Sequence, residues 1–353
     1  MRDHRRTGIL AVLLLAPVSA ELLQAYLGDL GGPVSLIFVV LFFVPLYGGA
    51  ALLIREISVR TGRGWRGRLL LALAFGIAMP TVIDLSLFTP RRDDIDDWST
   101  IVHAASFLGI GWSAVLTWVG GHVLMSVGAP IVVGETLARR PGPWLGRFGL
   151  TGFSLAFLGW AVFIHVDAAN SYSTSAGPAA YAVSALLIAT PVTLAFTRLG
   201  APSTPRQPIR CPSPWVLGLL GGAGMLALDL CPQSWAGVAQ YVTALVVVGG
   251  LVGHWSRSPG WSMRHMAALV WAALLARTST GFLAPLPQDT TWAEKIAQNL
   301  TYLLLITALG WALHRRTRRD QSGGATGGSP GGGPSDDGSP LVGFSKGGVP
   351  PET

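Results

Sequence analysis

Apolar residues along this chain occur in runs of about twenty, and short loops rich in arginine separate most of these runs. A helix of about 20 apolar residues is long enough to cross the hydrocarbon core of a bilayer. We therefore expect an all-α fold, a polytopic bundle of about ten transmembrane helices. The expected spans cover residues 8–27, 34–54, 69–88, 112–137, 148–166, 179–196, 215–230, 238–252, 266–283 and 296–313.

The stretch 101–138 decides the number of spans. Its 38 residues are too few for two helices of about 20 residues joined by a turn. We expect one span that begins at Trp112 and an interfacial or re-entrant piece at 101–111. Two spans here would invert the orientation of every helix that follows.

The basic residues give the orientation. With ten spans, one set of loops together with both termini holds 21 of the 25 Lys and Arg residues. The opposite set holds Arg91, Arg92 and Lys295, while Arg277 lies inside the ninth span. Cytoplasmic loops carry the excess of basic residues, so both termini are expected in the cytoplasm. The Arg-, Gly- and Pro-rich composition favours a bacterial inner (plasma) membrane.

Composition also indicates the expected partners and the limits of the transmembrane domain. Only 12% of the residues are charged and the net charge of +7 is spread over loops, so the lipid bilayer is the expected partner and nucleic acid is not. Residues 320–353 are rich in Gly, Ser and Pro. Such a segment buries too little apolar surface to fold. We expect a transmembrane domain at 1–319 and a disordered cytoplasmic tail at 320–353.

The N-terminus has two interpretations. Arg5 and Arg6 precede an apolar stretch that ends in Val-Ser-Ala at residues 18–20, which resembles a signal peptide with its cleavage site. Cleavage would remove the first span and leave the others oriented as before. The apolar character continues to Leu27, which favours an uncleaved first span.

Ionisable side chains inside spans are costly and therefore candidates for function. Glu21, Asp84, His122, His165 and Arg277 are the candidates for substrate binding or proton coupling. Their positions predict a polar cavity in the outer half of the bundle. Arg277 would hold an anionic group or neutralise a carboxylate that exchanges protons. The alternative for Arg277 is a structural ion pair with Glu21 or Asp84.

The candidates also have structural interpretations. Asp84 and Asp229 lie close enough to span ends for simple solvation, and His165 lies near the outer boundary. His122 follows two glycines, which allow close helix approach and favour an interhelical hydrogen bond. Glu21 lies deeper, and its sequence context favours neither interpretation.

Other patterns predict packing and local pairing. Gly218 and Gly222 form a small-xxx-small pair that is typical of helix packing faces. Glu135 lies one turn before Arg139, which predicts a local ion pair. The chain has no zinc-type cysteine spacing and no Gly-x-Ser-x-Gly, His-Glu-x-x-His or phosphate-loop motif. We expect no metal and no cofactor.

Residues 46–56 (Leu-Tyr-Gly-Gly-Ala-Ala-Leu-Leu-Ile-Arg-Glu) resemble a signature of an uncharacterised polytopic membrane family that is commonest in actinobacteria. Residues 121–131 (Gly-His-Val-Leu-Met-Ser-Val-Gly-Ala-Pro-Ile) resemble its second landmark, and Trp-Leu-Gly-Arg follows at 144–147. The resemblance covers about residues 10–165. It implies a multi-pass fold and a membrane location, and it brings no activity.

A more distant similarity is to the CAAX-protease-like intramembrane enzymes, in which a Glu-Glu pair and histidines activate a water molecule. At the comparable place, residues 78–81 are Ala-Met-Pro-Thr, so the acidic pair is missing. Glu21, Asp84, His122 and His165 would have to replace it.

Three functions are therefore open. The first is a transporter or permease-like protein with an outer-facing polar cavity for a small solute. The second is a membrane-embedded enzyme that uses acid and histidine chemistry on a lipid or a peptide. The third is a structural or accessory subunit whose polar residues only pair with one another. Dependence on a proton gradient would favour the first, and loss of turnover on His122→Ala would favour the second.

Overall fold

The computed structural model describes residues 4–24, 33–93, 95, 97–202, 209–287 and 290–324. The chain divides into two units, Met1–Thr317 and Arg318–Thr353. The described part of the second unit is the end of a helix. Most of the tail expected at 320–353 lies outside the described residues.

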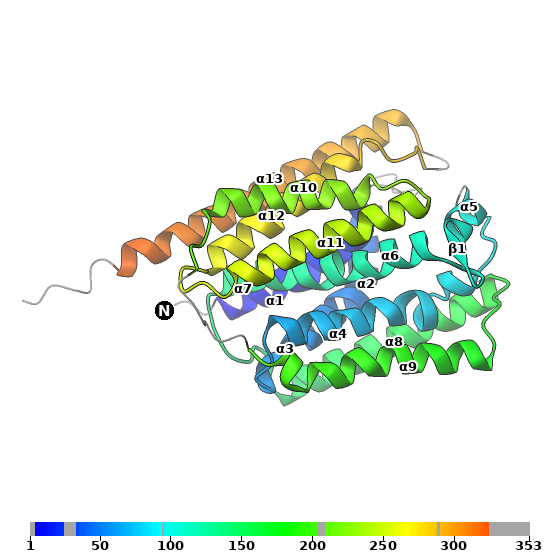
Figure 1. Cartoon of the computed structure of the whole chain (residues 1–353), viewed down its shortest axis with the longest axis horizontal. Helices are drawn as coiled ribbons and strands as arrows, with labels where there is room; N and C mark the ends of the chain where they lie inside the picture. The colour runs from blue at the N-terminus through cyan, green and yellow to red at the C-terminus, as the bar shows by residue number, and fades with distance from the viewer. Residues whose placement is uncertain are drawn as a thin grey trace, which may run out of the picture. The chain divides into compact units, whose positions relative to one another are not determined.

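Helices make up nearly all of the described chain (Figure 1). The α-helices are α1 (Arg5–Pro17), α2 (Pro33–Phe43), α3 (Gly49–Arg60), α4 (Trp65–Ala78), α5 (Trp98–His103), α6 (Trp112–Gly121), α7 (Ala129–Ala138), α8 (Arg147–Ser171), α9 (Pro178–Ala195), α10 (Pro214–Asp229), α11 (Trp235–Trp255), α12 (Met263–Thr280) and α13 (Trp292–Gly324). Wider π-helical turns are η1 (Val18–Leu22), η2 (Val44–Gly48), η3 (Met79–Ile83) and η5 (His122–Gly128). Two short 3₁₀ turns are η4 (Ser86–Phe88) and η6 (Arg198–Gly200).

The chain is an all-α bundle in which seven of the described helices are long and apolar enough to cross a membrane. Helices also occupy the described parts of the other three expected segments, but they are shorter or more polar. Helix α10 has only 16 residues, and α12 contains both Arg264 and Arg277. The described part of the first segment ends at residue 24. Length and composition therefore give seven spans where the sequence pattern predicts about ten.

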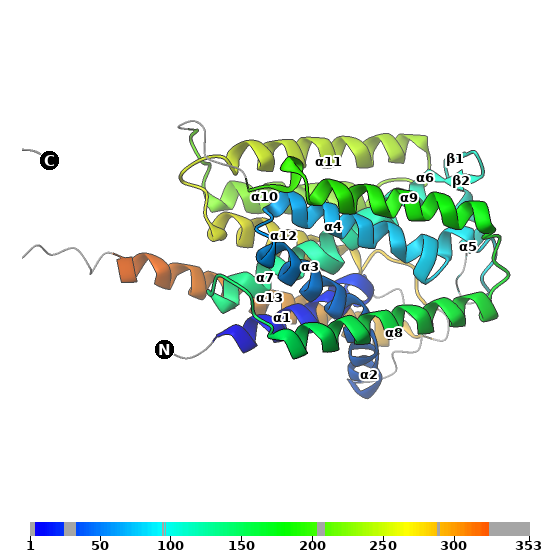
Figure 2. The same cartoon turned by 90° about the horizontal axis from the view of Figure 1, so that it is seen from below.

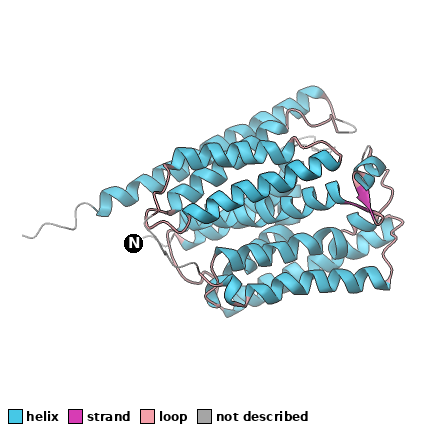
Figure 3. Ribbon diagram, in the orientation of Figure 1, coloured by secondary structure: helices cyan, strands magenta, loops and turns pink. Residues whose placement is uncertain are grey.

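The stretch 101–138 contains one long helix, as predicted. It runs without a break from Trp112 to Ala138 through α6, η5 and α7. Before it come α5 and the antiparallel hairpin of β1 (Ser106–Phe107) and β2 (Ile110–Gly111), the one sheet among the described residues (Figure 3). Trp98 of α5 stacks on Trp118 of α6 with ring centroids 5.5 Å apart, which holds this piece against the long helix.

The long helix Trp112–Ala138 lies at the centre of the first unit. Figure 1 shows α6 and α7 between α3, α4, α8 and α9 on one side and α10, α11 and α12 on the other, and α7 is again interior in Figure 2. The helix contributes to both apolar cores of the protein. Val127 and Ile131 pack with α1, α3 and α4, while Met125, Ala129 and Val133 pack with α10 to α13.

Glycines bring α10 and α12 together. A Cβ at Gly221 would lie 2.2 Å from the carbonyl oxygen of Leu269, so only glycine permits this approach. Gly218 and Gly222 face Ala272 at 3.6–3.9 Å, measured from the Cβ each would carry. The packing face predicted from this glycine pair is confirmed, and it fixes the level at which polar groups of the two helices meet.

Candidate functional site

Four π-helical turns occur in four different helical segments, and each contains a proline or lies beside one. Pro17 precedes η1, Pro45 and Pro80 lie within η2 and η3, and Pro130 follows η5 by two residues. A proline has no N–H and collides with the carbonyl one turn earlier, so a widened turn relieves the helix. Isolated π-turns occur frequently at functional sites. Three of the four turns here carry polar side chains that meet.

Glu21, Tyr47 and His122 form the central cluster, each from a different π-turn. The Tyr47 hydroxyl donates a hydrogen bond to Glu21 Oε1. The Tyr47 ring stacks on the His122 imidazole with centroids 5.6 Å apart, and the Phe75 ring lies edge-on to both. Tyr47 is buried, whereas Glu21 and His122 are half-buried. The structure thus connects a carboxylate to an imidazole through a phenol.

Two serines hold this cluster in place. His122 Nδ1 and Ser126 Oγ lie 3.0 Å apart, so the serine orients the imidazole ring. Ser19 Oγ donates to the carbonyl oxygen of Met125 at 2.7 Å, which connects η1 with η5. His122 therefore makes a hydrogen bond within its own helix and an aromatic contact between helices, where the sequence predicted an interhelical hydrogen bond.

Arg277 forms the ion pair that the sequence allowed, but with a different partner. Its Nη1 lies 2.5 Å from Asp229 Oδ1, and Thr280 Oγ1 donates to Asp229 Oδ2 at 3.0 Å. The Asp229 side chain is only 4% exposed, so the solvated position expected for it is wrong. The pairing with Glu21 or Asp84 is also not the one formed, because the close packing of α10 on α12 brings Asp229 to Arg277.

Tyr241 of α11 packs against the central helix. Its side chain is buried, and its hydroxyl occupies the space where a Cβ of Gly120 would lie, at 2.1 Å. Tyr241 shares an apolar core with Leu22 of η1, Leu228 of α10 and Leu274 of α12. The helices that carry Glu21, Asp229 and Arg277 therefore contribute to one core.

Asp84 and His165 lie together at the end of η3. Asp84 Oδ1 accepts hydrogen bonds from the backbone N–H of Ser86 at 2.8 Å and from the Ser86 hydroxyl. His165 Nδ1 donates to the carbonyl oxygen of Val82 at 2.6 Å. Asp84 follows the last residue of the long helix that begins at Trp65, and its side chain is half-buried.

A second charged cluster was not anticipated as a unit. Arg55 and Glu56 are 1% and 0% exposed and lie 2.6 Å apart. The Glu135 carboxylate forms ion pairs with Arg55 Nε at 3.3 Å and with Arg68 Nη1 at 2.8 Å. The Arg55 guanidinium stacks on Trp144 at 3.6 Å from the ring centroid. The sequence predicted a local partner for Glu135, Arg139, but these bonds reach α3 and α4. A sequence signal was present, because these charges all lie near the basic ends of spans.

The described residues include histidines, cysteines and carboxylates in several parts of the chain. Among them, no three His, Cys, Asp or Glu side chains come together where they could hold a metal ion. Cys211 and Cys231 are both free thiols. Asn299, which formally begins a glycosylation sequon, is fully buried in α13. No protein-family model, curated protein or solved structure matches this chain, so the site is interpreted from its own geometry.

Proposed function

We propose that this multi-pass membrane protein is a proton-coupled transporter of a small solute. Glu21, Tyr47 and His122 are its protonation centre, and Arg277 with Asp229 forms the charged wall beside it. The observation that carries this proposal is the meeting of a carboxylate, a phenol and an imidazole from three π-turns of three helices. Ionisable groups at this depth mark proton and solute pathways in membrane bundles.

The arrangement couples a proton to helix packing. The Tyr47 hydroxyl donates to Glu21 while Glu21 is a carboxylate, and protonation of Glu21 weakens this charge-assisted bond. Weakening it loosens η1 from η2, and these turns are already displaced from regular helix geometry. A proton on Glu21 thus favours a second packing of α1 against α3. Asp84 and His165 at the end of η3 supply further groups along the same route.

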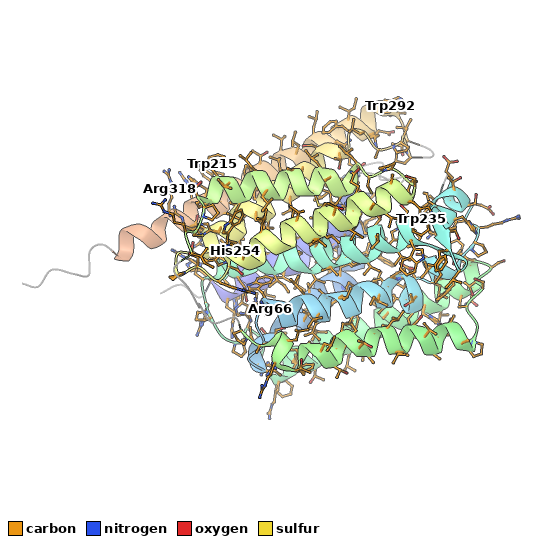
Figure 4. All side chains as sticks on the ribbon, viewed as in Figure 1. Arg66, Trp215, Trp235, His254, Trp292 and Arg318 are labelled. Atoms are coloured by element: carbon orange, nitrogen blue, oxygen red, sulfur yellow. The ribbon has the colours of Figure 1, made fainter. Side chains whose placement is uncertain are left out.

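We also propose the finer topology, with ten crossings, both termini in the cytoplasm, and the bacterial plasma membrane as the location. The resemblance to the actinobacterial membrane family supports this location. Figure 4 shows Arg66, Trp215 and His254 near one end of the helices and Trp235 and Trp292 near the other. Tryptophans at both ends are typical of the two interfaces of a membrane.

The two native cysteines test this topology. Cys211 precedes α10 and Cys231 follows it, and both are partly accessible. Ten crossings place Cys211 in the cytoplasm and Cys231 outside. A membrane-impermeant thiol reagent on intact cells should label Cys211→Ser, which keeps Cys231, and spare Cys231→Ser. Detergent should make both variants reactive, and the reverse pattern in intact cells contradicts the orientation.

Transport is tested in liposomes that contain the purified protein and a trapped pH-sensitive dye. We expect at least one member of a panel of sugars, amino acids, organic anions and amines to move protons in response to its gradient. Glu21→Gln should abolish the solute-dependent proton movement, while Asp167→Asn, the same change at an exposed position, should preserve it. Proton movement that survives Glu21→Gln contradicts the proposed centre. If no solute in the panel moves protons, transport is not supported.

The alternative is a membrane-embedded hydrolase, and the contact of Ser126 with His122 at 3.0 Å favours it. A base within hydrogen-bond reach of a hydroxyl is the basic unit of nucleophilic catalysis. Ser126 is fully buried, however, so a substrate would need the helices to part. Hydrolysis of a lipid or peptide ester that is lost in Ser126→Ala and retained in Glu21→Gln would favour the enzyme over the transporter.

A further inference from the structure

Accessibility changes abruptly halfway along the central helix Trp112–Ala138. Every residue from 115 to 124 is half-buried, and none of them is exposed. From 125 to 134 every residue except Gly128 is buried. A helix at the surface of a bundle has freely exposed residues along its length. Here the whole perimeter of one half of an interior helix is partly accessible.

Adjacent glycines show where this accessibility comes from. The space beside Gly120 is filled by the Tyr241 hydroxyl of α11. Gly76 of α4 approaches the next side of the helix, where its Cβ would lie 2.8 Å from the carbonyl oxygen of Val119 and 3.5 Å from His122 Cβ. Beside Gly121, no other described part of the protein lies within 4 Å of the position of a Cβ. The helix is therefore packed toward α4 and α11 and open on the side of Gly121.

This open side is only partly accessible. Helix α8, by contrast, lies at the surface: none of the residues in its most apolar part is buried, and Gly159 is exposed with nothing near its Cβ position. In the long central helix no residue after Trp112 is exposed. Thr117, one turn before Gly121, lies on the same side and is also half-buried.

We infer that the Thr117–Gly121 side of α6 lines a water-filled recess that binds a small hydrogen-bonding solute next to His122. The recess ends at Met125, where the buried half of the helix begins. The His122 imidazole and the Tyr241 hydroxyl border the Gly120–His122 step and supply polar partners. Water occupies a cavity when such partners are present.

The recess itself does not depend on the transporter proposal, whereas its role as the solute site rests on that proposal. A solute in this recess would lie directly beside the protonation centre. The buried residues 125–134 close the recess toward the Ala138 end of the helix. The solute and the proton would then reach the centre from the same side.

Two cysteine variants separate a water-filled recess from a surface that faces lipid. Gly121→Cys and Gly159→Cys each put a thiol where the Cβ has open space, in a background with both native cysteines replaced by serine. The probe is a charged, membrane-impermeant methanethiosulfonate added to intact cells. Thiolates react and thiols do not, so water must surround a thiol that is modified rapidly. We expect Gly121→Cys to react at least about tenfold faster than Gly159→Cys.

Equal, slow modification of the two variants would overturn the recess. If Gly121→Cys does not fold, Thr117→Cys on the same side replaces it, because the only hydrogen bond found for the Thr117 hydroxyl is with its own helix. The thiol reaction needs no solute, so it tests the recess independently of transport. Once a solute is known, modified Gly121→Cys should lose its uptake. Uptake that continues unchanged would overturn the role of the recess as the solute site.

Discussion

Glu56 and Glu21 carry the same carboxylate group, but their surroundings differ. Glu56 is fully buried and receives Arg55, Arg60 and the backbone N–H groups of Trp144 and Leu145. Glu21 is half-buried, and Tyr47, one of its partners, is a neutral phenol. Cations and backbone donors fix the Glu56 carboxylate between helices, so we assign that cluster to the scaffold. The Glu21 carboxylate is partly accessible, so we assign its cluster to the site.

The largest loss of stability is expected at the scaffold. Glu56→Ala leaves Arg55 buried beside Trp144 with Glu135 as its remaining acidic partner. Breaking a buried pair by removing one partner costs about 3–5 kcal/mol. We expect a loss of this size in the free energy of unfolding in detergent, measured by tryptophan fluorescence. Arg60→Ala, which removes a partly exposed partner of the same carboxylate, should cost less than about 1 kcal/mol. Similar losses for both variants would contradict this division.

Arg277→Ala should lower the free energy of unfolding by about 3 kcal/mol, because Asp229 is then buried without its charge partner. Asp229→Ala in addition should restore part of this stability. A double-mutant cycle measures the difference, and a coupling of about 1–3 kcal/mol is expected between residues in direct contact. Additive losses would show that the two side chains act independently, and would remove the charged wall from the proposed site.

The sequence predicts where helices lie along the chain better than it predicts which helices pack together. Runs of about 20 apolar residues marked the described helical segments, and the length argument for 101–138 gave the single helix that the structure contains. The partner of Arg277 depended on which helices pack together. That choice is made by glycines such as Gly221, whose contact with Leu269 involves residues 48 positions apart. Hydropathy does not contain this information.

Prolines gave a partial signal for the site. Pro17, Pro45, Pro80 and Pro130 each lie beside a π-turn, but α9 continues through Pro191 as a regular helix. A proline thus raises the chance of a widened turn, and tertiary contacts decide whether one forms. The stacking of Tyr47 on His122 could not be read from the sequence, because it depends on two such turns lying at the same depth.

Alanine substitutions at the adjacent residues Gly120 and Gly121 of the central helix should have different effects on stability. Gly120→Ala places a methyl group against the Tyr241 hydroxyl, and overpacking of this kind costs about 1–3 kcal/mol. Gly121→Ala puts the same methyl group into open space, and alanine is the better helix former. Its unfolding free energy should therefore be unchanged or slightly higher. A loss at Gly121 as large as that at Gly120 would mean that the space beside Gly121 is filled.

At Tyr47 a small effect on stability should accompany a large effect on function. Tyr47→Phe removes one hydroxyl and keeps the ring that packs between His122 and Phe75, so the loss should be near the value of a single hydrogen bond, about 1 kcal/mol. Because the hydroxyl is the only bridge seen between Glu21 and the imidazole among the described contacts, solute-dependent proton movement should fall at least tenfold. Tyr302→Phe, which also removes the hydroxyl of a buried tyrosine, should leave proton movement unchanged. If Tyr47→Phe instead moved protons normally and lost several kcal/mol of stability, the Glu21 cluster would belong with the Glu56 cluster, and both would be scaffold.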